Sequence, residues 1–134
     1  MSARSRNKGA RVEREIAAEL HALTGVTFSR NLEQVRSAAH GDLIADDPDW
    51  PFSIEVKSRA TGNGCAAAWQ AQAVNAAALA GKIPVVVVKY DRRPVRVSVP
   101  LKAIHASLPA DEWAEISLPG LAYLAREIMA ECAE

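Results

Sequence analysis

The hydrophobic pattern of the chain begins with one amphipathic helix. Over residues 10–23 the apolar side chains Val12, Ile16 and Leu20 recur at helical spacing and form one stripe. Glu13 lies at the edge of this stripe, so its carboxylate faces along the core side of the helix. We therefore expect a helix that carries an acid beside the core.

Three short strands are expected after this helix. The pattern predicts strands over residues 26–30 and 41–46, with Asp42 at the entrance of the second. Residues 52–57 then alternate between apolar and polar side chains, which predicts a third strand with Glu55 on its polar face. Two neighbouring strands would therefore bring the carboxylates of Asp42 and Glu55 close together.

The second half of the chain predicts a helix, two strands and further helices. Gly81 ends an alanine-rich segment, as glycine often does at a helix C-terminus. The next strand is a continuous apolar run typical of burial on both faces. In the strand after it, apolar and polar side chains alternate, which predicts one solvent-exposed face. The expected bounds are a helix over residues 66–80, strands over 83–90 and 95–99, and helices over 101–108 and 119–133.

This order predicts a single α/β domain, a mixed sandwich of sheet and helices in the order αβββαβ, over residues 1–134. Residues 1–9 are expected to form a flexible basic arm, and residues 105–134 a helical C-terminal extension. A length of 134 residues, 49% of them hydrophobic, suffices for one core and is short for two typical domains.

The apolar runs and the cysteines of the chain indicate its cellular compartment. No apolar run reaches the roughly 18 residues of a membrane span, and the basic N-terminus lacks an apolar signal core, so we expect a cytoplasmic protein with no membrane partner. Cys65 and Cys132 lie far apart without a CxxC spacing, which argues against a zinc site or a disulfide framework. We expect both to be reduced thiols.

The charge distribution favours a nucleic-acid partner more than the net charge of zero does. Residues 1–36 carry seven basic and four acidic groups, and residues 37–104 eight and six, whereas residues 105–134 carry one and six. Arginine outnumbers lysine eleven to five, which suits phosphate contacts because the guanidinium group binds two oxygens at once. Ordinary solvated surface charge explains the same numbers equally well.

The candidate chemistry is metal-assisted hydrolysis of a phosphodiester. Asp42 and Glu55 would supply the hard oxygen ligands that Mg²⁺ prefers, and the backbone carbonyl of Val56 would complete the protein share of the shell. Lys57, on the same strand face as Glu55, would hold the attacking water and offset charge on the phosphate. Glu13 could reach a second metal ion or its water shell, and no organic cofactor is expected.

Each of these signals alone has an ordinary structural explanation. An acidic-x-Lys triplet on a strand is commonly a solvated face, and an Asp at a strand entrance is commonly a cap or turn residue. The joint order is more specific: a Glu on the first helix, Gly-Asp before a strand, and Glu-x-Lys about a dozen residues later.

With this order the chain resembles the PD-(D/E)xK nuclease superfamily, and its surroundings resemble the Holliday-junction-resolvase branch. Residues 8–15 (KGARVERE) are similar to the opening motif of archaeal resolvases, residues 36–45 to their second motif, and residues 81–85 to the strand after their helix. Residues 30–36 and the Trp69-x-x-Gln72 pattern look closer to small nucleases of phages and prophages. Gly41 stands where the family name has proline.

The resemblance implies a restriction-endonuclease-like core with a central mixed sheet flanked by helices. It also implies dependence on Mg²⁺ or Mn²⁺, and often a homodimer that presents two sites to a four-way junction. By position, Glu13, Asp42 and Glu55 would be the acidic site residues and Lys57 the catalytic lysine. Gln72 would be the helix glutamine that supports the site, with Gln70 as a weaker candidate.

Several further residues have candidate roles near the site. Trp69 could stack on a nucleobase, but burial between helix and sheet is the simpler interpretation. His40 could act as a general base, but a polar turn residue before a strand is the simpler interpretation. The arginines and lysines near the site would grip phosphates and position the DNA without reading its sequence. The DNA-binding candidates are Lys8, Arg11, Arg14, Arg30, Arg36 and Arg59.

The sequence thus predicts a Mg²⁺-dependent, structure-selective DNA endonuclease of the resolvase type, acting on branched or four-way DNA in a bacterial cell or a phage-infected host, at the nucleoid. Two alternatives stay open. One is a nuclease of other specificity, such as a restriction or repair enzyme. The other is a non-catalytic DNA-binding protein on a degenerate nuclease scaffold.

Overall fold

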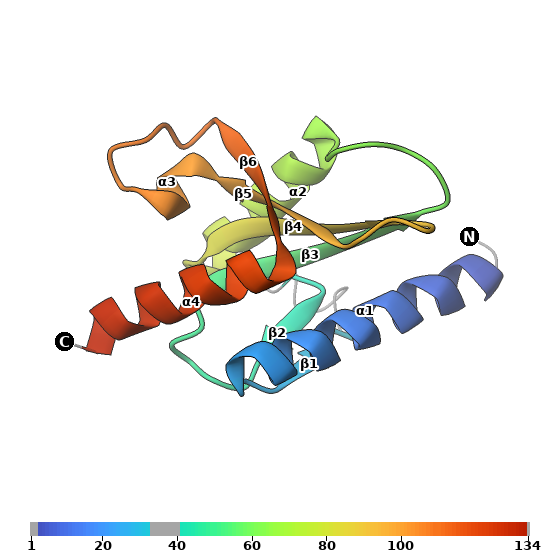
Figure 1. Ribbon diagram of the computed structural model, residues 1–134, viewed down its shortest axis with the longest axis horizontal. Coiled ribbons are helices and arrows are strands. Elements are labelled where there is room, and N and C mark those ends of the chain that lie inside the picture. The colour runs from blue at the N-terminus through green and yellow to red at the C-terminus, as the bar shows by residue number, and fades with distance from the viewer. Residues whose placement is uncertain (1–2, 33–40, 134) are drawn as a thin grey trace.

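Six strands form one sheet in the order β1-β2-β3-β4-β5-β6, so each strand pairs with its neighbours in sequence (Figure 1). The computed structural model describes residues 3–32 and 41–133. The elements are α1 (Ala3–Thr24), β1 (Phe28–Arg30), β2 (Leu43–Ala45), β3 (Phe52–Arg59), α2 (Ala67–Ala80), β4 (Ile83–Tyr90), β5 (Arg96–Pro100), α3 (Leu101–Ile104), β6 (Trp113–Ser117) and α4 (Leu118–Ala133).

The sheet is mixed, as the pattern predicted. Among the strands of the described ranges, only β3 and β4 run parallel, in register from Phe52 opposite Ile83 to Arg59 opposite Tyr90. Parallel strands need a crossover, and α2 provides it. All other neighbours are antiparallel and are joined by shorter connections. The central pair β3–β4 is therefore the longest and most regular part of the sheet.

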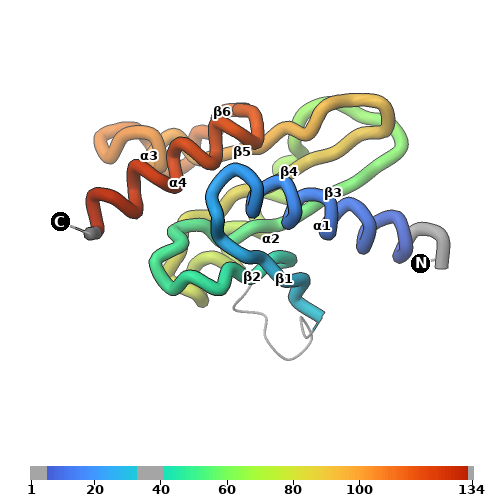
Figure 2. The backbone as a smooth tube through the Cα atoms, turned by 60° about the horizontal axis from the view of Figure 1, so that its bottom comes forward, coloured from blue at the N-terminus to red at the C-terminus, as the bar shows by residue number. Residues whose placement is uncertain are grey.

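Helices cover the two faces of the sheet unequally. On one face, α1 and α4 pack through Ile16, Leu20 and Leu121 onto the apolar side of the sheet, where they form the main core. On the other face, α2 covers Val86 and Val88 of β4 in a smaller cluster. The two views show α1 and α4 side by side along one face and α2 across the other (Figures 1 and 2). The site residues of β3 lie on the α2 face.

The strand β4 matches the prediction at both ends, and its four central valines are buried. Val85 and Val87 face the main core, whereas Val86 and Val88 face α2, so both faces are covered as expected. Gly81 has φ 67°, the left-handed conformation that ends α2. The prediction of a solvent-exposed face on β5 is wrong at Ser98, which is only 6% exposed and accepts a hydrogen bond from Gln70 of α2.

Three expectations at the ends of the chain need correction. The helix α1 begins at Ala3, so the expected arm is already helical from that residue; its arginines and lysine are good helix formers. The predicted helix over residues 101–108 is only the four residues of α3. The C-terminal extension is not wholly helical, because β6 pairs with β5 and buries part of Ala114 and Ile116 against the core.

Two further properties concern membranes and thiols. Within the described ranges, no helix combines the length and the apolar character needed to cross a bilayer. Cys65 and Cys132 are both free, as expected, and Cys132 is exposed near the end of α4.

Candidate active site

An open groove between α1, β3 and α2 brings together most of the predicted site residues. It encloses about 740 Å³ and is lined from five parts of the chain: α1, β1, the entrance to β2, β3 and α2. We call it the site groove and define it by Glu13, Arg30, Asp42, Val56, Lys57 and Gln72. Residues separated by up to about 60 positions therefore share one surface hollow.

Asp42 is fixed where β2 approaches β3. Its backbone N–H donates to the carbonyl of Ile54 at 2.7 Å, and its Oδ2 accepts from the N–H of Val56 at 2.7 Å. Before it, Gly41 lies so close to β3 that an added Cβ would come within 2.3 Å of the Ile54 carbonyl oxygen. Only glycine fits at that position, which explains why glycine precedes the aspartate here.

The hydrogen bond from Val56 also sets the direction of its carbonyl. In a strand, the N–H and C=O of one residue point to the same side. Because the N–H of Val56 points to Asp42, its carbonyl oxygen points toward the same side, away from β4. The predicted backbone ligand is therefore on the correct edge of β3.

Glu55 is the most deeply buried acid of the site. Its side chain is 3% exposed, and its Oε2 has no hydrogen-bond partner within the described part of the chain. Burial, together with the negative charge and hydrogen bond of Asp42, raises the pKa of Glu55 to about 8. At neutral pH the Asp42–Glu55 pair thus holds a proton between two carboxyl groups.

Lys57 and Gln72 meet at the edge of the groove. The Nζ of Lys57 donates to the Oε1 of Gln72 at 2.7 Å, which links β3 to α2. Gln70, the weaker candidate, points elsewhere: its amide donates to the hydroxyl of Ser98 at 3.1 Å. The geometry therefore selects Gln72 as the glutamine that holds the lysine.

Glu13 reaches the groove but is already paired. Its Oε1 accepts from the Nε of Arg30 at 3.1 Å, with both side chains largely buried. Burial raises the pKa of Glu13, Asp42 raises it further, and Arg30 opposes the shift. Across residues 3–32 and 41–133, no group of three or more His, Cys, Asp and Glu side chains is arranged to hold a metal ion. The acids that meet directly are Asp42 and Glu55.

The DNA-binding candidates divide among several places. Lys8, Arg30 and Arg59 line the site groove, whereas Arg11 and Arg14 line a neighbouring hollow. The guanidinium group of Arg59 lies 5.1 Å from the centre of the Trp69 ring, and this ring packs on the α2 cluster as the burial interpretation expected. Arg36 and His40 lie outside the described residues.

Asn31 is a site residue that sequence reasoning missed. It is 8% exposed, its Nδ2 donates to the carbonyl of Gly41 at 3.0 Å, and its N–H donates to the carbonyl of Asp42 at 2.9 Å. Asn31 therefore holds the Gly41–Asp42 backbone from the side opposite Ile54. The signal in the sequence was a polar residue directly after a short strand. That signal did not predict the contact of Asn31 with the backbone of Gly41 and Asp42. Arg6 was also missed, and it lines the site groove.

Comparison with known proteins agrees with this geometry. A family profile described as "phage putative PDDEXK endonuclease" matches residues 4–120. Among solved structures, the chain is similar to Hjc, a Holliday junction resolvase from the archaeal hyperthermophile Archaeoglobus fulgidus, with a TM-score of 0.56 and 23% identity. That likeness covers 88% of this chain and 98% of the other, and it confirms the expected restriction-endonuclease-like fold. No curated protein matches the chain.

The family match spans the first helix, the whole catalytic sheet region and α2. It includes Asp42, Glu55 and Lys57, in the order that gives the superfamily its name. Asp42 and Lys57 line the site groove, and Glu55 is buried beside Asp42. The chain belongs to the PD-(D/E)xK endonucleases, in the family of phage nucleases.

Proposed function

We propose that this nuclease is a Mg²⁺-dependent DNA endonuclease that cuts branched or four-way DNA, with Mn²⁺ able to substitute. One observation carries the proposal. Two carboxyl groups, Asp42 and Glu55, meet at a strand edge, and one oxygen of Glu55 is buried without a partner. A buried acid in that position is costly unless a cation or a proton compensates it.

The donor set fits a hard divalent cation. Mg²⁺ typically takes one or two carboxylates and keeps several waters, and Asp42, Glu55 and the Val56 carbonyl offer three oxygens in such an arrangement. A cation would replace the proton that the pair holds at neutral pH. When bound, it would supply Lewis acidity at the phosphate and lower the pKa of a water molecule.

The other residues of the groove would position the reactants. Lys57, held by Gln72, would donate a hydrogen bond to the attacking water or to a phosphate oxygen and offset the charge that develops there. Water would add to phosphorus as one P–O bond to the sugar breaks. The attacking water would lose a proton to solvent, and the departing sugar oxygen would take one from solvent, which leaves a phosphomonoester and a hydroxyl end. Glu13, bound to Arg30, would act through water rather than as a direct ligand.

We propose junction selectivity because the similar archaeal protein is a Holliday junction resolvase. Resolving a junction takes two cuts, and a homodimer would supply one active site for each. Supporting this, α2 has no charged residue and exposes Val74 and Leu79, an apolar face of the kind found at interfaces. Light scattering of the purified protein would show twice the mass of the 134-residue chain if the dimer is correct.

We also place the enzyme in the bacterial cytoplasm, at the nucleoid where its substrate is.

Cleavage assays test the activity itself. We expect the wild-type protein with Mg²⁺ to nick supercoiled plasmid and to cut a synthetic four-way junction, and Asp42→Asn and Lys57→Ala to lose about a thousandfold or more in rate. Lys102→Ala, an exposed lysine of α3, is the matched control and should cut normally.

The same assay separates the alternatives. Cleavage of linear duplex as fast as of junctions would favour a restriction or repair specificity. Equal inactivity of the wild type and both variants on every DNA form would indicate a binding protein on a nuclease scaffold.

A further inference from the structure

A second groove adjoins the site groove on its α1 side. It encloses about 1240 Å³ between α1 and the turn that joins β4 to β5. We call it the α1–turn groove and define it by Lys8, Arg11, Arg14, Ala60, Lys89 and Arg92. Lys8 and Ala60 line both grooves, so one hollow continues into the other. Figure 1 shows this turn beside the N-terminal end of α1.

The α1–turn groove carries a surplus of positive charge. Five basic and two acidic side chains line it. Each acid already has a partner: Asp91 binds Lys8 at 2.6 Å, and Glu15 lies 3.8 Å from Arg11. Asp91 also feels the charges of Lys89 and Arg92, so two carboxylates face five cationic groups and the groove keeps a net positive charge. A continuous basic hollow beside a nuclease site fits a polyanion.

Arg92 occupies a backbone position that does not suit an arginine. The N–H of Arg93 donates to the carbonyl of Tyr90 at 3.1 Å, which closes a four-residue turn, and Arg92 has φ 63°. Among the described residues other than glycine, it alone has positive φ. Glycine or asparagine would adopt this conformation with less strain. An arginine in this strained conformation points to a use for its side chain.

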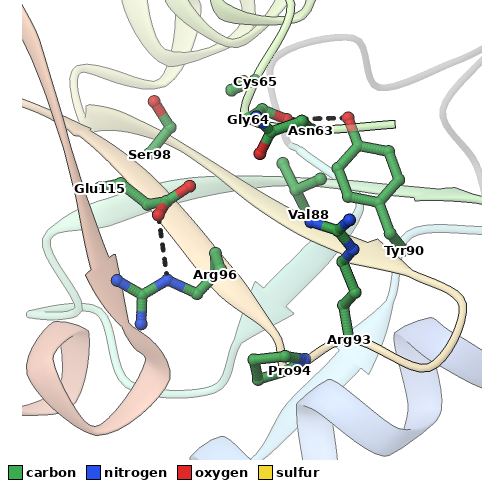
Figure 3. A pocket seen from close by; sticks show the side chains of 10 residues that line it. All are labelled: Asn63, Gly64, Cys65, Val88, Tyr90, Arg93, Pro94, Arg96, Ser98 and Glu115. Atoms are coloured by element: carbon green, nitrogen blue, oxygen red, sulfur yellow. Dashed lines mark hydrogen bonds and ion pairs between the residues drawn. The ribbon is translucent and has the colours of Figure 1, made fainter. Parts of the chain in front are cut away.

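The side chain of Arg92 is available for a ligand. It is exposed and makes no hydrogen bond or salt bridge with the residues that the structure describes. The neighbouring Arg93 turns the other way. Its side chain runs toward Asn63 and lines a separate pocket of about 220 Å³ with Arg96 and Glu115 (Figure 3). Both arginines also line a small hollow beside Thr61 and Gly62, but of the two only Arg92 lines the α1–turn groove.

We infer that Arg92 is a phosphate-binding residue that holds the DNA backbone in the α1–turn groove while the scissile phosphate lies in the site groove. The inference rests on the proposed function, because it assumes a DNA substrate. Arg14 and Lys89 line the same hollow and add to its attraction for phosphate. Such contacts position a substrate without reading its sequence.

The test uses Arg92→Gly, which relieves the backbone while removing the guanidinium group. Binding of a fluorescent duplex and a four-way junction is measured without divalent metal over a range of salt. We expect Arg92→Gly to bind both about three- to tenfold more weakly, with a salt slope shallower by about one phosphate contact. Its melting temperature should equal or exceed that of the wild type, which excludes loss of folding as the cause.

Arg93→Ala is the matched control, because it removes the same charge from the same turn, and it should bind within about twofold of the wild type. Arg92→Lys should keep most of the affinity. Wild-type affinity and slope in Arg92→Gly would overturn the inference, and so would an equal loss in Arg93→Ala. A wild type that binds DNA but never cuts it would refute the proposed function, whereas the phosphate contact of Arg92 would still be judged by the binding data.

Discussion

The two faces of β3 carry opposite kinds of side chain. On the main-core face, Phe52 and Ile54 are buried among apolar residues of α1 and α4. On the α2 face, Ser53 and Glu55 are equally buried, yet Ser53 Oγ and Glu55 Oε2 have no hydrogen-bond partner within the described residues. One strand thus combines a satisfied face with an unsatisfied one.

The difference shows how the fold tolerates the energetic cost of buried, unsatisfied polar groups in its site. An unsatisfied buried polar group costs about 1–3 kcal/mol, whereas a fully buried large apolar side chain contributes a similar amount in the favourable direction. The core face of β3 therefore offsets the cost of the α2 face. Stability and chemistry are separated by the alternation of side chains along eight residues of strand.

The largest effects are expected from substitutions at adjacent residues of β3 that lie on opposite faces. We expect Glu55→Gln to lower the cleavage rate about a thousandfold without lowering stability near neutral pH. Ile54→Ala should lower the free energy of unfolding by about 2–5 kcal/mol, because it leaves a cavity in the main core. Cleavage at low temperature and urea denaturation give the two readouts. Equal effects of both changes on both readouts would erase the distinction.

A second change tests how the α2 face is aligned. Gly41→Ala places a Cβ against the backbone of Ile54, so Asp42 must shift away from Val56. We expect the cleavage rate to fall about a hundredfold, as a displacement of about 1 Å can cause, together with a lower melting temperature. Gly9→Ala is the stability control, since its Cβ would meet nothing within 4 Å in α1 and should stabilise the helix. Normal cleavage by Gly41→Ala would show that the close approach is unimportant.

The third change uses pH. Glu55 has a pKa of about 8 when folded and an ordinary value near 4.5, so unfolding releases its proton between these values. The contribution of Glu55 to the stability of the metal-free wild type should therefore be most favourable below about pH 4.5 and decline as pH rises toward 8. Glu55→Gln keeps an amide donor for Asp42 and should remove most of this decline. Parallel stability curves for the two proteins between pH 5 and 9 would contradict the assigned pKa.

The smallest expected effect is that of Ser53→Ala. Because the Ser53 hydroxyl is buried without a partner, its removal should leave the free energy of unfolding unchanged or raise it by about 1 kcal/mol. Cleavage should be unaffected, which chemical denaturation and the junction assay would both show. A clear loss of stability would indicate that Ser53 has a bonding role.

Much of the fold was predictable because its signals are local. The valine run of β4 and the glycine that ends α2 act within a few residues, and both gave correct bounds. By contrast, β6 was missed because its identity depends on pairing with β5, and its own residues alternate only weakly. Non-local pairing is the part of a fold that periodicity does not report.

The candidate site follows the same rule. The order of Asp42, Glu55 and Lys57 along the chain predicted that they would lie close together. Asp42 and Lys57 do line one groove, and Glu55 is buried against Asp42. The pairing of Glu13 with Arg30 and the support that Asn31 gives to Gly41 were not predictable, because each joins separate elements through side chains. Sequence alone therefore indicated which acids meet but not which neighbours hold them.

The most direct test of the central claim is calorimetric titration of Mn²⁺ and Mg²⁺ into the full chain, in two buffers of different ionisation enthalpy, near pH 7. We predict saturable binding to the wild type with release of protons from the Asp42–Glu55 pair, and no comparable binding to Asp42→Asn. Identical heats from the wild type and Asp42→Asn, or binding without proton release, would contradict a cation site built from these two carboxyl groups.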